Sequence, residues 1–260
     1  MTTRSAIARD RNLPRPVKRS ATAGLARRMA WFAGLLFVVS GAAHRFGLLT
    51  TEAFATVLAV VAGVAGAALL LALFAWRRVW VKGFRGAGDV AHALIVSLLV
   101  LLPFGWAGAE AMTHPMLSDI ATDLDDPPAL ASREPLPEAA KTEQAQAYPE
   151  VVGHRYPLPV ERLSELVRTM MEERGWVPVE QADATDGITL RAPARTLVLG
   201  FTSDVVIRIT DEGETSYVDM RSRSRFGRTD LGDNAARIAG FLADLDTRAA
   251  SVTAVPTVED

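Results

Sequence analysis

Residues 197–224 read LVLGFTSDVVIRITDEGETSYVDMRSRS, and this stretch decides the fold of the second half of the chain. Apolar and polar residues alternate on both sides of an acidic, glycine-containing turn at 211–214, as in two half-buried strands at 197–210 and 215–224. The residues expected to face the core are Val205, Ile207, Ile209, Val218 and Met220. The stretch therefore predicts an antiparallel β-hairpin with one buried face.

Two more strands and two helices surround this hairpin in the sequence. The predicted elements are a helix at 159–175, strands at 176–181 and 188–192 joined by an Asp186–Gly187 turn, and a helix at about 231–247. Both helices carry their apolar residues on one side. Consecutive hairpins favour an antiparallel four-stranded sheet, and the two helices should cover its apolar face.

Three long uncharged runs precede this α+β domain. They cover residues 29–44, 53–76 and 90–109. About 20 apolar residues cross a bilayer as a helix, and the first run reaches that length if Arg45 snorkels. Three such runs would overwhelm the core of a small soluble domain, so we predict three transmembrane helices. A cleaved signal peptide is an alternative for the first run, and it leaves the topology of the remainder unchanged.

The charges of the two halves differ in sign. Residues 1–110 carry 13 basic and 4 acidic side chains, whereas residues 111–260 carry 15 and 26. The basic residues gather in the arm before the first run and in the loop after the second, and the positive-inside rule places both in the cytoplasm. An acidic second half argues against nucleic acid as a partner, because phosphates need a positive surface.

These features predict a membrane-anchored α+β protein of the bacterial inner membrane. Its parts are a basic cytoplasmic arm (1–28), a transmembrane region (29–110), a Pro- and acid-rich linker (111–158) and an extracytoplasmic domain (159–250). The first part of the linker, residues 114–128, could pack on the domain. Ala59, Gly63 and Ala67 recur at four-residue spacing in the second helix, which favours close helix packing or a homodimer.

An arginine-rich segment follows the hairpin. Strand alternation places Tyr217, Asp219, Arg221, Arg223 and Arg225 on the face opposite Met220. A four-residue turn at 211–214 would pair Arg221 with Asp204 and Arg208 with Tyr217, with Asp219 diagonal to Arg208, as a structural ion network. Arg223, Arg225 and Arg228 instead lie before the N-terminus of the last helix, where guanidinium and backbone N–H groups suit an anion. Both interpretations stay open.

Two motifs carry a resemblance to a known family. Residues 218–234, VDMRSRSRFGRTDLGDN, resemble the C-terminal signature of the domain-of-unknown-function family 1499, and residues 115–123, PMLSDIATD, resemble its N-terminal element. Ala121 departs from the pattern, where Ser or Thr is expected. The resemblance covers about residues 114–246 and implies no assigned reaction. The family-pattern positions that it implies are Asp119, Thr122, Asp123, Arg221, Arg225, Asp230 and Asn234.

These observations favour a membrane-tethered domain that binds an anionic ligand, a lipid headgroup or an envelope protein. The alternatives are a hydrolase of phosphate or ester envelope substrates, built on Asp119, Asp123 and the arginines, and a structural envelope protein. Whether the chain is an enzyme stays open, but no serine elbow, phosphate loop or zinc spacing occurs in the sequence. There is no cysteine, and His114 and His154 lie in no motif, so we expect no cofactor and no metal.

Overall fold

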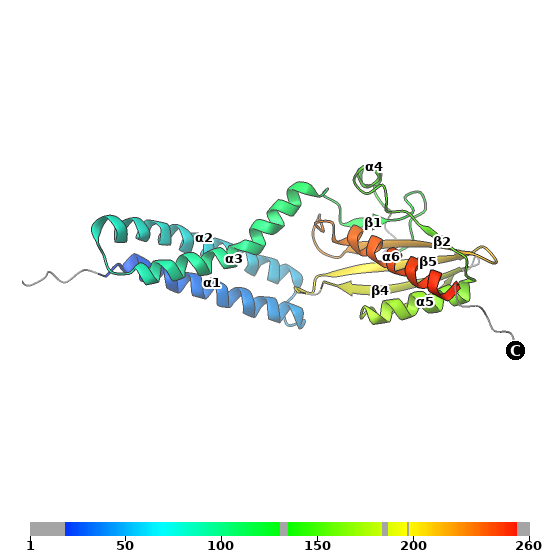
Figure 1. Ribbon diagram of the computed structural model, residues 1–260, viewed down its shortest axis with the longest axis horizontal. Helices are drawn as coiled ribbons and strands as arrows, with labels where there is room; N and C mark the ends of the chain where they lie inside the picture. The colour runs from blue at the N-terminus through cyan, green and yellow to red at the C-terminus, as the bar shows by residue number, and fades with distance from the viewer. Residues whose placement is uncertain (1–18, 131–134, 184–186, 197, 254–260) are drawn as a thin grey trace, which may run out of the picture. The chain divides into compact units, whose positions relative to one another are not determined.

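The computed structural model describes residues 19–130, 135–183, 187–196 and 198–253 (Figure 1). Most of the predicted basic arm, Asp186 of the predicted turn and Leu197 lie outside these ranges. The chain forms two compact units. The first comprises residues up to 40 together with 52–104, and the second comprises 41–51 and the chain from 105 onward.

The first unit is built from three helices: α1 (Ala21–Arg45), α2 (Thr51–Lys82) and α3 (Ala87–Thr113). Each is long and apolar enough to cross a membrane. The helices contact one another mainly through small side chains, and these buried residues are Ala26, Ala33, Ala65, Ala68, Ala72 and Ala93. Large apolar side chains such as Leu35, Leu70 and Leu99 are exposed instead. This inside-out distribution is typical of helices packed in lipid.

The small-residue stripe predicted for close packing does not coincide with the buried alanines. Ala59 and Gly63 are exposed and Ala67 is half-buried, so the stripe runs along an outer side of α2. A contact through it with a second copy of the chain stays a prediction.

The second unit contains an antiparallel sheet, which confirms the fold class predicted from the hairpin pattern. Four of its strands are β3 (Val179–Asp183), β4 (Gly187–Arg195), β5 (Thr202–Asp211) and β6 (Ser216–Ser224). Two three-residue strands, β1 (Asp119–Ala121) and β2 (His154–Tyr156), both pair with β6. Within the described residues the sheet therefore has six strands instead of the predicted four, in the order β1-β6-β5-β4-β3 with β2 beside β6.

The two additional strands come from residues 111–158, which we expected to form an extended linker. This segment also contains α4 (Glu138–Ala147). Leu117, Ile120 and Val151 from it are buried in the main core. The segment is therefore part of the domain, and the packing expected only for residues 114–128 extends to its end.

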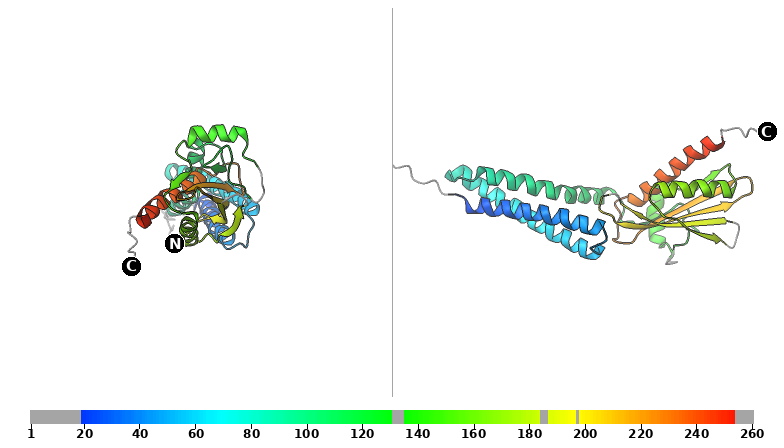
Figure 2. Two further views of the ribbon diagram at one scale, coloured as in Figure 1. Left: turned by 90° about the vertical axis from the view of Figure 1, so that its right-hand side faces the viewer. Right: turned by 90° about the horizontal axis from the view of Figure 1, so that it is seen from below.

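One face of the sheet is covered by α5 (Val160–Glu173) and α6 (Asp233–Thr253), as the amphipathic patterns predicted (Figure 2). Leu163 and Met170 of α5 and Ile238 and Leu245 of α6 are completely buried, and they pack with strand residues such as Ile207. The core between the helices and the sheet leaves the opposite face of the strands for polar side chains.

The register of the β5–β6 hairpin differs from the prediction. Arg221 lies opposite Val206, Arg223 lies opposite Asp204, and Arg208 lies opposite Asp219. The predicted Arg221–Asp204 and Arg208–Tyr217 pairs are therefore wrong. The turn still has four residues, but it occupies 212–215, since Asp211 pairs with Ser216. Gly213 adopts φ 84° there, and its N–H donates to the Asp211 carboxylate.

Candidate functional site

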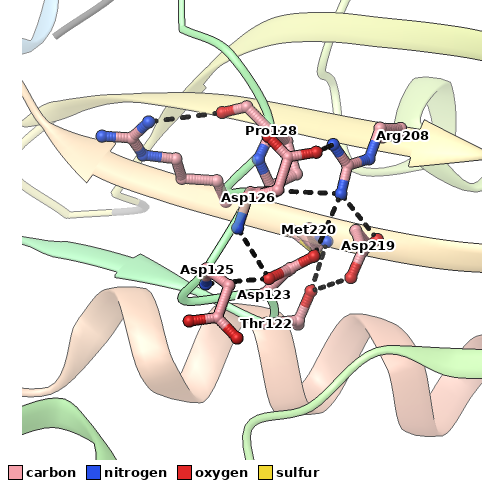
Figure 3. Close-up of polar contacts among 9 residues, drawn as sticks. Thr122, Asp123, Asp125, Asp126, Pro128, Arg208, Asp219 and Met220 are labelled. Carbon is pink, nitrogen blue, oxygen red and sulfur yellow. Dashed lines mark hydrogen bonds and ion pairs between the residues drawn. The ribbon is translucent and has the colours of Figure 1, made fainter. Parts of the chain in front are cut away.

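A short segment, residues 122–128, crosses the polar face of the sheet, and we call it the strap. It is fixed at its start by Thr122, whose hydroxyl donates to Asp219 Oδ1 at 2.9 Å and accepts from the Met220 N–H at 2.9 Å (Figure 3). The Thr122 N–H donates to the Met220 carbonyl. Thr122 and Asp219 are both buried. The strap therefore continues the β1–β6 pairing beyond the end of β1.

Arg208 of β5 holds the middle of the strap (Figure 3). Its guanidinium donates to the carboxylates of Asp126 (2.7 Å), Asp219 (3.0 Å) and Asp123 (3.3 Å), and to the Asp126 carbonyl (2.9 Å). Burial alone would lower the pKa of Arg208, but the hydrogen bonds to Asp219 and Asp126 outweigh it and raise the pKa. Asp123 also accepts the backbone N–H groups of Asp125 and Asp126. Arg208 is therefore charged and bound to the strap.

A second arginine, Arg221 of β6, is completely buried on the same face. Its guanidinium forms two parallel hydrogen bonds to Asp119 of β1, at 2.9 and 2.8 Å, and reaches the Pro128 carbonyl at 3.3 Å. Only 2% of the Arg221 side chain and 13% of the Asp119 side chain are exposed. The family-pattern positions Asp119 and Arg221 thus form one buried ion pair between β1 and β6, and the contact of Arg221 with Pro128 joins the strap to the sheet.

Asn234, in the first turn of α6, is the centre of a third network on the other face. Its Oδ1 accepts from Ser222 Oγ at 2.7 Å and from Arg237 at 2.6 Å. Its Nδ2 donates to the Ser118 carbonyl and to Ser224 Oγ, both at 3.0 Å. The side chain thereby connects α6 to β6 and to the residue before β1.

Asp230 stabilises the N-terminus of α6. Its carboxylate accepts the backbone N–H groups of Gly232 and Asn234, and its own N–H donates to the Leu117 carbonyl. Burial raises the pKa of Asp230, and these two N–H groups partly oppose that rise. Asp230 is therefore a cap and anchor for α6.

The three predicted anion-binding arginines have different environments. Arg225 is exposed and donates to Asp204 at 2.6 Å and 3.0 Å, a pair that we did not predict. Arg223 is half-buried, with its Nε 3.8 Å from the Asp119 carboxylate. Arg228 is exposed and forms no ion pair within the described part of the chain. Of the three, Arg228 is the one most available to a ligand.

Arg225 and Arg228 belong to residues 225–232, which connect β6 to α6 and which we call the β6–α6 loop. Phe226 of this loop is 39% exposed, and its ring stacks on that of Phe201. The loop is attached to the segment that follows α3, because Thr229 Oγ1 donates to the Pro115 carbonyl at 3.4 Å. His114 packs against Gly232 so closely that an added Cβ would lie 2.5 Å from its ring. The β6–α6 loop thus contacts residues 114 and 115, which directly follow the end of α3.

Sequence reasoning missed several members of these networks. Asp126 belongs to the predicted Pro- and acid-rich linker, and no contact is predicted for Arg237. Gln144 of α4 is also buried, and its amide exchanges two hydrogen bonds with the backbone of Ala121. The contacts of Asp126 and Gln144 join residues far apart in sequence, so no local motif marks them. Arg237 contacts Asn234, three residues before it, a spacing that brings side chains together on a helix.

A His–Asp–Tyr cluster also went unnoticed. His154 Nδ1 and the Tyr156 hydroxyl both contact Asp246 Oδ1, at 3.0 and 2.7 Å. Burial and the hydrogen bond to Asp246 raise the pKa of Tyr156, so its hydroxyl stays protonated at neutral pH. The cluster therefore connects β2 to α6 without an activated nucleophile.

The carboxylates that a hydrolase would need are already engaged. Asp119 is bound by Arg221, and Asp123 by Arg208 and two backbone N–H groups. Among the described residues, no three His, Asp or Glu side chains converge in a way that would hold a metal ion. The arrangement fixes the strap and α6 to the sheet, and it leaves Arg228 of the β6–α6 loop exposed.

A match to one known family begins at β1 and ends within α6. No curated protein and no solved structure matches the chain. Residues 119–245 match the family described as "Protein of unknown function (DUF1499)". All seven family-pattern positions, from Asp119 to Asn234, lie inside the match, and each forms a hydrogen bond or ion pair described above. Residues 119–245 therefore match the DUF1499 family, the family that the two sequence motifs resemble.

Proposed function

We propose that the chain is a membrane-anchored binding protein of the bacterial inner membrane, and that its α+β domain lies outside the cytoplasm. The β6–α6 loop is the binding element, and its ligand is the phosphate of an anionic lipid headgroup. The supporting observation is that Arg228 is exposed and without an ion pair in the described ranges, on a loop hydrogen-bonded to Pro115. Pro115 is only two residues beyond the last residue of α3.

The chemistry of the loop suits a membrane surface. If α3 crosses the bilayer, a loop attached at Pro115 lies close to the headgroups. An aromatic ring and a guanidinium beside it are the side chains that favour this layer, and each Arg near an anionic surface contributes about 1 kcal/mol. Phe226 and Arg228 supply both from neighbouring positions.

The net charge of the domain opposes anion binding except where arginines gather locally, as in this loop. Residues 111–260 carry 26 acidic and 15 basic side chains, so the domain as a whole repels anions. Arg208 and Arg221 are already neutralised by aspartates. Binding therefore depends on the few loop arginines and weakens as salt screens them over about 8 Å at physiological ionic strength.

The proposed orientation makes a direct prediction. An alkaline phosphatase fused after Asp260 should be active, and a green fluorescent protein fused there should not fluoresce if exported through the Sec pathway. The reason is the excess of Lys and Arg before α1 and between α2 and α3, which retains those segments in the cytoplasm. A fluorescent fusion together with an inactive phosphatase fusion would contradict this orientation and would place the domain in the cytoplasm.

The loop itself is tested with the full chain in nanodiscs. In discs that contain phosphatidylglycerol, backbone amides of residues 225–232 should exchange more slowly than in discs of phosphatidylcholine alone. Arg228→Ala should remove most of this difference, roughly five-fold in exchange rate, the equivalent of one Arg–headgroup contact. Its melting temperature should stay unchanged, because Arg228 is exposed.

Arg155→Ala is the matched control. Arg155 is also an exposed arginine, but it pairs with Glu212 in the β5–β6 turn, at the other end of β6. This variant should leave the lipid-dependent protection intact. Equal protection of the loop in both kinds of disc would reject headgroup binding and favour an envelope protein as the partner.

A further inference from the structure

An open cavity of about 590 Å³ lies within the helical unit, at the end where α1 begins and α2 passes to α3. Arg19, Arg27, Arg85 and His92 line it, together with residues 86–89 at the start of α3. None of these residues belongs to the DUF1499 match or to the networks described above. The cavity is therefore a separate feature of the membrane unit.

Backbone contacts bring the arginines of this cavity together. The Ser20 N–H donates to the Arg85 carbonyl at 2.9 Å, and residues 19 and 85 form a parallel bridge. Gly86 adopts φ 143° and lies so close to α1 that an added Cβ would be 3.4 Å from that of Ala23. The start of α1 and the α2–α3 loop are thus fixed side by side, with their guanidinium groups around one space.

The cavity carries more positive than negative charge. Asp89 is the acidic side chain in its lining, and it pairs with Arg27 at 3.1 Å and with Arg19 at 3.7 Å. The lining thus contains one carboxylate and three guanidinium groups. Arg85 is exposed and makes no side-chain ion pair with any residue that the structure describes. The first N–H groups of α3, which have no partner within the helix, add further donors for an anion.

The surroundings indicate an amphiphilic ligand. Apolar side chains are exposed on the outer sides of the helices that meet at this end: Leu25 of α1 is 50% exposed, and Trp80 of α2 is 81% exposed. An anion bound among the arginines would therefore lie at the end of helices whose outer surfaces are apolar and can accept acyl chains. We infer that this cavity binds the phosphodiester of an anionic phospholipid, with its chains along the helices. The inference rests on the membrane placement proposed above, which puts the cavity at the cytoplasmic leaflet.

The test uses native mass spectrometry of the full chain in detergent, with phosphatidylglycerol or phosphatidylcholine added. The wild type should retain phosphatidylglycerol in preference to phosphatidylcholine. Arg85→Ala should reduce the retained phosphatidylglycerol about five-fold, and Arg85→Lys should reduce it less, because it keeps the charge. Arg77→Ala removes an exposed arginine of α2 outside the cavity lining, and it should change retention less than two-fold.

All variants are also measured with Arg228→Ala, so that lipid held by the β6–α6 loop does not obscure the result. Preferential retention that persists with Arg228→Ala and falls with Arg85→Ala supports the cavity, whatever the loop does. Equal losses for Arg77→Ala and Arg85→Ala, or equal retention of both lipids, would overturn the inference. Displacement of the lipid by millimolar glycerol phosphate would assign the cavity to a soluble phosphate compound, and the lipid assignment would then fail.

Discussion

Replacing Arg221 by alanine is expected to destabilise the α+β domain by about 3–5 kcal/mol, the range for a buried ion pair that loses one partner. The Arg221 side chain is 2% exposed and binds Asp119 through two parallel hydrogen bonds. Alanine would leave the Asp119 carboxylate, itself only 13% exposed, without this partner and would remove a donor from the Pro128 carbonyl. The measurement is urea-induced unfolding of the full chain in detergent.

A double-mutant cycle separates the pair from other effects. If the penalty arises from an uncompensated charge, Asp119→Ala should cost a similar amount, and the double variant should cost much less than the sum. Replacement of both residues by apolar ones, Arg221→Met with Asp119→Leu, should restore much of the lost stability. A loss below about 1 kcal/mol for Arg221→Ala would place the pair among ordinary surface contacts.

Arg225→Ala is the matched exposed variant. Arg225 pairs with Asp204 through similar guanidinium–carboxylate contacts, but 56% and 41% of the two side chains are exposed. Exposed pairs of this kind contribute about 0–1 kcal/mol because water and salt screen them. The two arginines therefore lie four residues apart in one motif, and burial alone separates their expected effects.

The sequence was sufficient to predict the elements that have a strong local pattern. The alternation in β5 and β6, the apolar stripes of α5 and α6, and the long apolar helices α1, α2 and α3 each repeat a spacing over many residues. Such patterns report the local conformation directly. The register of the hairpin could not be predicted from such a pattern. The turn lies one residue later than predicted, and this displacement shifts the pairing of the two strands by two residues. A two-residue shift keeps every side chain on its face, so alternation cannot detect it.

The strap and the short strands could not be predicted for a related reason. β1 and β2 have three residues each, too few for a period to emerge. The aspartates of the strap have the composition of a solvated linker, and their shared contact with Arg208, at least 82 residues away in sequence, leaves no local pattern. The family resemblance identified Asp119, Thr122, Asp123 and Arg221 as a set, but their pairing required the three-dimensional arrangement of the sheet.

Asn234→Ala should have the second largest effect, a loss of about 3 kcal/mol in the free energy of unfolding. The Asn234 side chain is completely buried and uses both of its ends. Alanine would leave the Ser222 hydroxyl without its acceptor and would remove a donor from both the Ser118 carbonyl and Ser224 Oγ. Buried groups left without a partner cost about 1–3 kcal/mol, because water no longer reaches them.

Two further variants in α6, Asn234→Asp and Thr247→Ala, test this explanation. Asn234→Asp keeps the shape and the Oδ1 acceptor, but it replaces the donating amide by an oxygen that faces the Ser118 carbonyl, so it should be at least as harmful as alanine. Thr247→Ala, on the exposed side of α6, removes a hydroxyl that bonds only its own helix and should cost within about 0.5 kcal/mol. Amide exchange should accelerate at Ser224 and at the start of α6 in both Asn234 variants. If Asn234→Asp instead proves as stable as the wild type, the side chain acts mainly through Arg237, whose guanidinium would gain a carboxylate partner.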